Sequence, residues 1–335
     1  MTPRLQVEDL HVRFDTDEGA VLAVNGVSFS VEPGGVLALV GESGCGKSMT
    51  ALAMLGLLPP TATRTGYIRL EGRDISGLSQ REMRRIRGRD ISMVFQEPMT
   101  SLNPVFTIGY QIGEVLRRHE GLSRSEAHAR AVDLLDLVRI PAAARRVREY
   151  PHQMSGGMRQ RVMIAMALAC NPKVLLADEP TTALDVTIQA QVLDIMRDLQ
   201  QDLGTSIVIV THDLGVVADI ADEVAVMYAG HVVETGTVDA LFSNPQHPYT
   251  VGLLGSVPRP DLVLATTQNR LVEIPGLVPT LRRPPSECVF APRCPRADEP
   301  CLTRMPELVE TSVGQRAACV HPGPEQARQA GVAQV

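Results

Sequence analysis

A glycine-rich run at residues 41–48 has the residue types and spacing of a phosphate-binding loop. It reads Gly-Glu-Ser-Gly-Cys-Gly-Lys-Ser and follows an apolar stretch, 36–40, of buried-strand length. Its glycines let successive backbone N–H groups converge on an anion, and the helix expected after it adds a positive N-terminus. Lys47 would reach the β- and γ-phosphates of a nucleotide, and Ser48 would hold Mg²⁺. The predicted binding residues are Gly41, Ser43, Gly44, Cys45, Gly46, Lys47, Ser48 and Met49.

Two carboxylates, Asp178 and Glu179, follow a second apolar segment at 174–177. In-line phosphoryl transfer needs one charge for the metal and one base for the nucleophile, which such a pair at a strand end supplies. The alternative is an acidic turn or a helix cap, which the neighbouring motifs disfavour. We therefore predict that Asp178 holds Mg²⁺ through water and that Glu179 deprotonates the attacking water.

Three further motifs fit the same chemistry. Gln96 follows the apolar residues 93–95, and its side chain can touch both metal and water; it is predicted as a Mg²⁺ ligand. His212 follows the apolar segment 206–211, at the sheet edge where ligands collect, although a structural or capping histidine is the alternative. Ser155, Gly156 and Gly157 open an apolar helix and form a second phosphate-recognition surface. The predicted catalytic residues are Lys47, Gln96, Glu179 and His212.

The elements that must position these residues have an α/β pattern. Residues 5–40 contain strand-like segments, consistent with an antiparallel β layer leading into the phosphate loop. Residues 104–150 are polar and helical, with a capping box that begins at Ser123. Residues 159–230 alternate helix and apolar strand, as in a parallel sheet covered on both faces. We expect a P-loop nucleoside-triphosphatase fold with a helical subdomain over about residues 100–158.

Composition excludes some classes of protein. The 335 residues carry a net charge of −6, 3% aromatic residues and no tryptophan, which argues against a nucleic-acid partner. The basic cluster at 81–89 is the exception, and we predict a solvated helix face there. No apolar run approaches the length of a membrane helix, and no secretory apolar core follows Met1. We expect a cytoplasmic chain whose tie to a membrane comes from a partner.

Taken in order, these motifs resemble those of the nucleotide-binding subunit of an ABC transporter. The resemblance covers residues 4–250 and implies an ATPase that works as a head-to-tail pair, with the lysine loop of one domain and the Ser155 turn of the other enclosing each ATP. It implies that Phe14 stacks on adenine, although a partly buried strand residue is the alternative, and that Asp185 communicates across the dimer. The resemblance is carried by residues 41–48, Gln96, 155–157, Asp178, Glu179, Ala183, Leu184, Asp185 and His212.

The composition changes toward the C-terminus. Fourteen of the 24 prolines lie at or beyond Pro245, so this part cannot be mainly helix or central strand. It also holds four of the six cysteines. Disulfides and free structural thiols are alternatives, but ligation would supply folding energy that a small core lacks. Because the C-x2-C pairs of structural zinc are missing, a [4Fe–4S] cluster is favoured over zinc. The predicted ligands are Cys288, Cys294, Cys301 and Cys319.

The same region resembles the C-terminal extension of oligopeptide/dipeptide importer ATPases, a branch in which such cysteines can ligate an iron–sulfur cluster. The resemblance is carried by residues 244–250, 274–279 and 288–295, with Glu287 where the branch commonly has glycine. It implies two domains, an ATP-binding domain at 1–250 and the extension at 251–335.

The implied function is ATP hydrolysis that drives uptake of di- and oligopeptides at the cytoplasmic face of the membrane. The implied partners are a second ATPase subunit, a sibling rather than an identical chain, two transmembrane permease subunits and an extracytoplasmic substrate-binding protein. Import of nickel or another small solute is the alternative within the family. A soluble ABC ATPase that does not transport, acting on ribosomes or DNA, is the alternative outside it.

Overall fold

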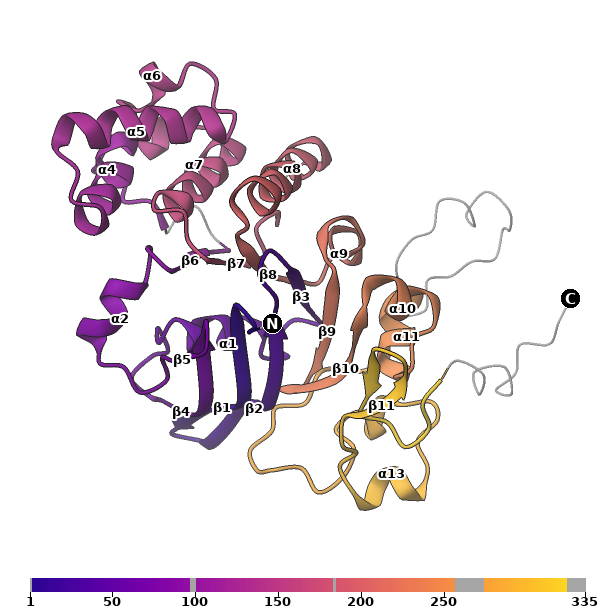
Figure 1. Ribbon diagram of the computed structural model, residues 1–335. Helices are drawn as coiled ribbons and strands as arrows, with labels where there is room; N and C mark the ends of the chain where they lie inside the picture. Colours follow the sequence, from indigo (N-terminus) through magenta and orange to yellow (C-terminus); the bar gives the residue numbers. More distant parts are fainter. Residues whose placement is uncertain (1, 97–100, 183–184, 257–273, 324–335) are drawn as a thin grey trace, which may run out of the picture.

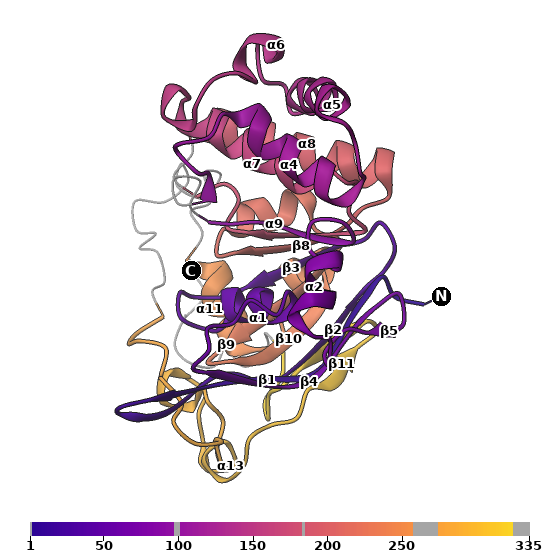
Figure 2. The ribbon, with the colours of Figure 1, turned by 90° about the vertical axis from the view of Figure 1, so that its left-hand side faces the viewer.

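The computed structural model describes residues 2–96, 101–182, 185–256 and 274–323. These residues form two β-sheets, a helical lobe and a C-terminal extension, with the lobe and the extension at opposite ends of the molecule (Figures 1 and 2). Among the described helices, none has the length and apolar character needed to cross a membrane.

The smaller sheet is antiparallel and has the strand order β2-β1-β4-β5. Its apolar residues alternate along β1, so that Leu5, Val7, Leu10 and Val12 are buried under the sheet, with register shifts between Val7 and Val12. This is the antiparallel layer predicted from the sequence. The strands are β1 (Leu5–Thr16), β2 (Gly19–Val31), β4 (Ala62–Leu70) and β5 (Arg73–Asp74).

The larger sheet has eight strands in the order β11-β12-β10-β9-β3-β8-β7-β6, and β9, β3, β8, β7 and β6 run parallel. Every residue of β3, β7 and β8 is buried, which explains their continuous Val, Leu and Ile runs. The strands are β3 (Val36–Val40), β6 (Ile91–Val94), β7 (Val174–Asp178), β8 (Ser206–Thr211), β9 (Glu223–Tyr228), β10 (His231–Thr237), β11 (Val309–Ser312) and β12 (Gln315–Ala317).

Helix α1 (Lys47–Met54) packs between the two sheets, and Ala51, Ala53 and Met54 are buried there. The main helices of the helical lobe are α4, α5, α6 and α7 (Figure 1). Ser123 and Glu126 form the predicted capping box at the start of α5. The lobe helices are α4 (Ile108–His119), α5 (Arg124–Leu137), α6 (Ala143–Arg146), η1 (Pro151–Gln153) and α7 (Gly156–Leu168).

The other helices surround the sheets. They are α2 (Gln80–Ile86), α8 (Val186–Leu203), α9 (Leu214–Ile220), α10 (Val238–Ser243), α11 (Pro248–Gly255), η2 (Ala291–Arg293) and α13 (Glu299–Thr303). Helix α2 belongs to the basic cluster, and its three arginines are exposed, as predicted for a solvated face.

The C-terminal extension is joined to the rest of the chain through the larger sheet. Strand β12 pairs antiparallel with β10, and β11 pairs with β12. Glu234 of β10 is completely buried and accepts hydrogen bonds from the backbone of Gln246 and His247 and from the side chain of Gln315. Short helices and edge strands agree with the proline-rich composition. The boundary after residue 250 remains a prediction, and α11 spans that residue.

Candidate functional site

The loop after β3 needs glycine at two positions because of close backbone contacts. A Cβ on Gly41 would lie 2.2 Å from the carbonyl oxygen of Met227, and one on Gly46 would lie 2.3 Å from that of Ala23. Both glycines have positive φ angles, 150° and 103°, which L-residues rarely adopt. Gly44 has open space around it. The loop is therefore fixed against β2 and β9 on one side and open to a ligand on the other.

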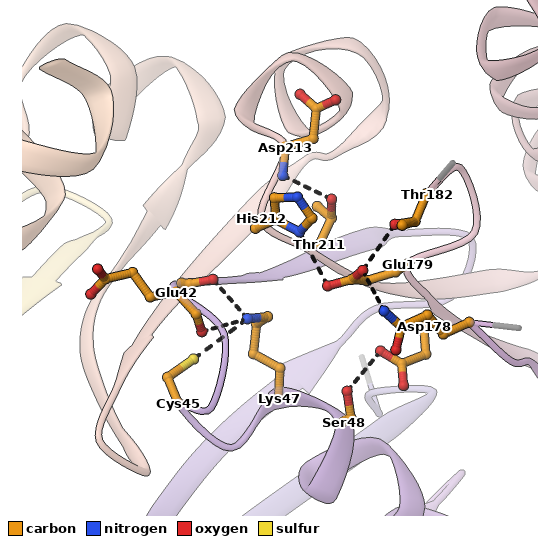
Figure 3. Close-up of polar contacts among 12 residues, drawn as sticks. Glu42, Cys45, Lys47, Ser48, Asp178, Glu179, Thr182, Thr211, His212 and Asp213 are labelled. Atoms are coloured by element: carbon orange, nitrogen blue, oxygen red, sulfur yellow. Dashed lines mark hydrogen bonds and ion pairs between the residues drawn. The ribbon is translucent and has the colours of Figure 1, made fainter. Parts of the chain in front are cut away.

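Lys47 begins α1 and turns back into the loop (Figure 3). Its Nζ donates to the carbonyl oxygens of Gly41, at 2.7 Å, and Glu42, at 2.9 Å. The side chain is buried, so the ammonium group is held at the centre of the loop, where phosphate oxygens would bind. Burial raises the pKa of Cys45, although Lys47 opposes the shift, so this thiol is neutral.

Ser48 and Asp178 provide two neighbouring oxygen ligands. The Ser48 hydroxyl donates to Asp178 Oδ1 at 3.0 Å. Burial raises the pKa of Asp178, an effect that the Ser48 hydrogen bond partly offsets. A buried carboxylate is stabilised by a nearby cation, and hydroxyl and carboxylate oxygens are ligands that Mg²⁺ accepts. These residues fit a Mg²⁺ site.

Glu179 directly follows β7 and accepts hydrogen bonds from three side chains (Figure 3). The donors are Gln96 Nε2 at 2.8 Å, Thr182 Oγ1 at 2.9 Å and His212 Nδ1 at 3.1 Å. Burial alone would raise the pKa of Glu179, but the hydrogen bonds from Thr182 and His212 outweigh it and lower the pKa. The carboxylate is therefore ionised at neutral pH, as a general base must be.

The structure brings five predicted residues together at the carboxyl edge of the parallel strands: Lys47, Ser48, Asp178, Glu179 and His212 (Figure 3). A sixth, Gln96, joins them through its hydrogen bond to Glu179. Sequence reasoning missed Thr182, whose only signal is a hydroxyl three residues after the acid. The amide nitrogen of Gln96 faces Glu179, and its role as a Mg²⁺ ligand remains a prediction.

The second predicted phosphate surface lies on a different element, the start of α7. Ser155 caps this helix, since its hydroxyl accepts from Met158 N at 3.3 Å. A Cβ on Gly156 would meet no atom within 4 Å, whereas one on Gly157 would lie 2.8 Å from Ile188 of α8. The Ser155 turn is exposed and packs beside α8.

Two residues implied by the resemblance have structural contacts of their own. Phe14 lies on β1, partly buried against the apolar cluster between the sheets, and its contact with adenine remains a prediction. Asp185 caps α8 by accepting from Ile188 N at 2.9 Å. Ala183 and Leu184 lie outside the described residues.

The four cysteines of the extension line one small hollow, together with His247 and His321. All six cysteines of the chain are free thiols, including Cys170. Backbone N–H groups of Arg296 and His321 donate to the sulfur atoms of Cys294 and Cys319, at 3.4 and 3.3 Å. Burial raises the pKa of Cys319 to about 11, so this group is a neutral thiol in the absence of a metal.

The ATP-binding cassette ATPases share three features that are present here. They are a lysine loop between two sheets, an acid pair at the end of a parallel strand, here β7, and a helical lobe that presents a Ser-Gly-Gly turn. Comparison with known proteins shows to which branch of these ATPases the chain is similar. Residues 24–182 match the ABC transporter family, and residues 233–301 match the family described as "Oligopeptide/dipeptide transporter, C-terminal region".

Relatives and solved structures agree with these matches. The chain is 52% identical over 314 residues to the oligopeptide transport ATP-binding protein OppD of Bacillus subtilis, covering 93% of this chain and 87% of that protein. It is 54% identical over 293 residues to the dipeptide transport ATP-binding protein DppD of the same organism, covering 87% and 86%. The dimeric ATP-binding cassette MJ0796, in a post-hydrolysis state with ADP and Pi, superposes with a TM-score of 0.64 at 28% identity, over 70% of this chain and 98% of that one. The chain belongs to the ABC transporter ATP-binding proteins, in their oligopeptide/dipeptide branch.

Proposed function

We propose that this chain is the ATP-hydrolysing subunit of an importer that takes up di- and oligopeptides. ATP hydrolysis is supported by the position of Glu179, an ionised carboxylate held by Gln96, Thr182 and His212 beside the Ser48–Asp178 pair. The peptide part is supported by the match of residues 233–301 and by the names of the relatives.

In the proposed mechanism, Phe14 stacks on adenine, and Lys47 with the loop N–H groups binds the β- and γ-phosphates. Ser48, Gln96 and Asp178 hold Mg²⁺, which would neutralise charge on the transferred phosphoryl group. Glu179 takes a proton from the attacking water. His212 donates to the γ-phosphate as negative charge spreads over its oxygens.

We propose that the site is completed by a second ATPase subunit. The Ser155 turn is exposed on a different element from the lysine loop, which suits a surface that binds the nucleotide of a neighbouring chain. A sibling chain is favoured over an identical one. Two permease subunits and an extracytoplasmic binding protein would complete the importer, with this subunit peripheral on the cytoplasmic face.

We also propose that Cys288, Cys294, Cys301 and Cys319 hold a [4Fe–4S] cluster. Support comes from the four thiols lining one hollow and from the two N–H···S hydrogen bonds, a contact that tunes such clusters. When bound, the cluster would cross-link a segment that has little core of its own. Zinc is the alternative, because ligand atoms of Asp298, Cys301 and His321 lie within 4.8 Å of one another.

The test is anaerobic purification with the permease subunits, followed by ATPase assays with candidate binding proteins loaded with peptides or with nickel. Stimulation of ATP hydrolysis by peptides supports the proposal. Stimulation by nickel alone would identify nickel as the substrate and would leave the assignment as an ATPase unchanged. Copurification with ribosomes or DNA in place of permeases would refute transport. Iron and sulfide analysis of the same sample tests the cluster. If zinc is found and sulfide is not, the four cysteines hold zinc and the proposed iron–sulfur cluster is refuted.

A further inference from the structure

Arg293 of the C-terminal extension contacts the phosphate loop. The Arg293 guanidinium makes a two-pronged ion pair with the carboxylate of Glu42, the second residue of the loop, at 2.7 and 2.9 Å. The Arg293 side chain is 5% exposed and that of Glu42 31% exposed, so water screens this pair less than a surface ion pair. The two residues are 251 positions apart in the sequence.

The extension fixes the position of this arginine. Its Nε donates to the carbonyl oxygen of Pro275 at 2.7 Å, and its Nη2 donates to that of Ile274 at 3.0 Å. The guanidinium also lies 5.6 Å from the centre of the Tyr228 ring. Arg293 ends η2 and directly precedes Cys294, so its backbone is continuous with the cysteine-lined hollow.

A second contact reaches the same loop residue. The backbone N–H of Glu42 donates to the hydroxyl of Tyr249 at 2.8 Å, and the Tyr249 ring is buried against Tyr228 and Phe290. The carbonyl oxygen of Glu42 accepts from Lys47 Nζ. The side chain, N–H and carbonyl of Glu42 are thus all engaged, two of them by residues near or within the extension and one by the phosphate-binding lysine.

We propose that Arg293 is a positioning residue for the phosphate loop, so that nucleotide affinity depends on the integrity of the four-cysteine extension. Without the ion pair, Glu42 keeps its hydrogen bond to Tyr249, but its carbonyl, one of the two that accept from Lys47, can shift. The effect falls on nucleotide binding rather than on the chemical step, because the hydrogen bonds of Glu179 are to Gln96, Thr182 and His212. This inference rests on the proposed nucleotide site at the loop.

The experiment is calorimetric titration of the full chain with MgADP, which needs neither hydrolysis nor a partner subunit. R293Q is expected to raise the Kd by about twofold to thirtyfold, the range typical of residues that couple neighbouring sites. R282Q is the matched control, since Arg282 also joins the extension to the ATPase part, through an exposed ion pair with Glu18 at 2.9 Å. R282Q is expected to leave the Kd unchanged. A wild-type chain that fails to bind MgADP would refute the nucleotide site itself and not this inference alone.

Two further variants keep the proposal testable if R293Q does not fold. Y249F keeps the ring packing and removes only the hydroxyl that accepts from Glu42 N–H, and we expect a smaller rise in Kd. In an E42Q background, R293Q should change the Kd less than it does alone, because the arginine acts through Glu42. An unchanged Kd in folded R293Q, or in Y249F if R293Q does not fold, overturns the proposal. An undiminished effect of R293Q in the E42Q background also overturns it.

Discussion

Replacing Glu179 with glutamine removes the base and preserves the geometry around it. Glu179 Oε2 accepts from Gln96 and Thr182, and Oε1 lies 3.1 Å from His212 Nδ1. A glutamine can keep its oxygen at the first position and place its NH₂ group at the second, where His212 Nδ1 accepts once the ring proton is on Nε2. The variant E179Q should therefore fold and bind nucleotide as the wild type does.

The expected loss lies in the chemical step. The pKa of Glu179 is lowered, so the wild-type side chain is an ionised proton acceptor at neutral pH, and the amide of E179Q is not one. Losing a positioned base costs about 10²- to 10⁴-fold in turnover, which corresponds to about 3–5 kcal/mol in activation free energy. The KM for ATP should stay near the wild-type value, because Lys47 and the loop are unaffected.

The assay is phosphate release by the purified transporter complex, with MgADP titration and size-exclusion chromatography of the same variant in ATP. E179Q should accumulate closed, ATP-bound dimers. T182V is the comparison, since it removes one hydrogen bond to Glu179 and keeps the base, and its loss of turnover should be much smaller. Turnover of E179Q near that of the wild type, with nucleotide binding intact, would show that Glu179 is not the base.

Three other perturbations have defined outcomes. G41A should abolish MgADP binding in the titration assay, because the added Cβ would lie 2.2 Å from the carbonyl oxygen of Met227. S155A in both ATPase subunits should lower phosphate release by the complex by about 10²-fold and leave MgADP binding to the isolated chain unchanged; undiminished release would refute the shared site. Burial lowers the pKa of His231 to about 4, so the unfolded chain binds the proton first. The free energy of unfolding should thus fall below pH 6.5, by about 3 kcal/mol at pH 4, and H231Q should remove that part of the pH dependence in denaturant titrations.

The grouping of the predicted site residues could be anticipated because these residues stand in short motifs at the ends of apolar strands. Lys47, Asp178, Glu179 and His212 each follow or adjoin a fully buried strand, and parallel topology brings such strand ends to one edge. The capping box at Ser123 was predictable for the same reason, since its two partners are three residues apart. Both the site motifs and the capping box were therefore recognisable from the spacing of residues close together in the sequence.

Contacts between distant segments were not predictable. The Arg293–Glu42 pair joins residues 251 positions apart, and no sequence motif contains both residues or predicts their contact. Strand β12 has three residues, too few for an alternating pattern, and its pairing with β10 depends on the tertiary fold. The four cysteines were identified from composition and spacing, whereas their arrangement around one hollow required the structure.

The late position of β12 in the chain affects how the protein is made. Strand β10 is synthesised about eighty residues before β12, so a nascent chain carries an unpaired sheet edge, and Glu234 lacks its hydrogen bond from Gln315, until β12 emerges. Unpaired edges recruit other strands and promote aggregation. A shortened form that stops after α11 would leave the β10 edge unpaired and should aggregate more readily than the full chain.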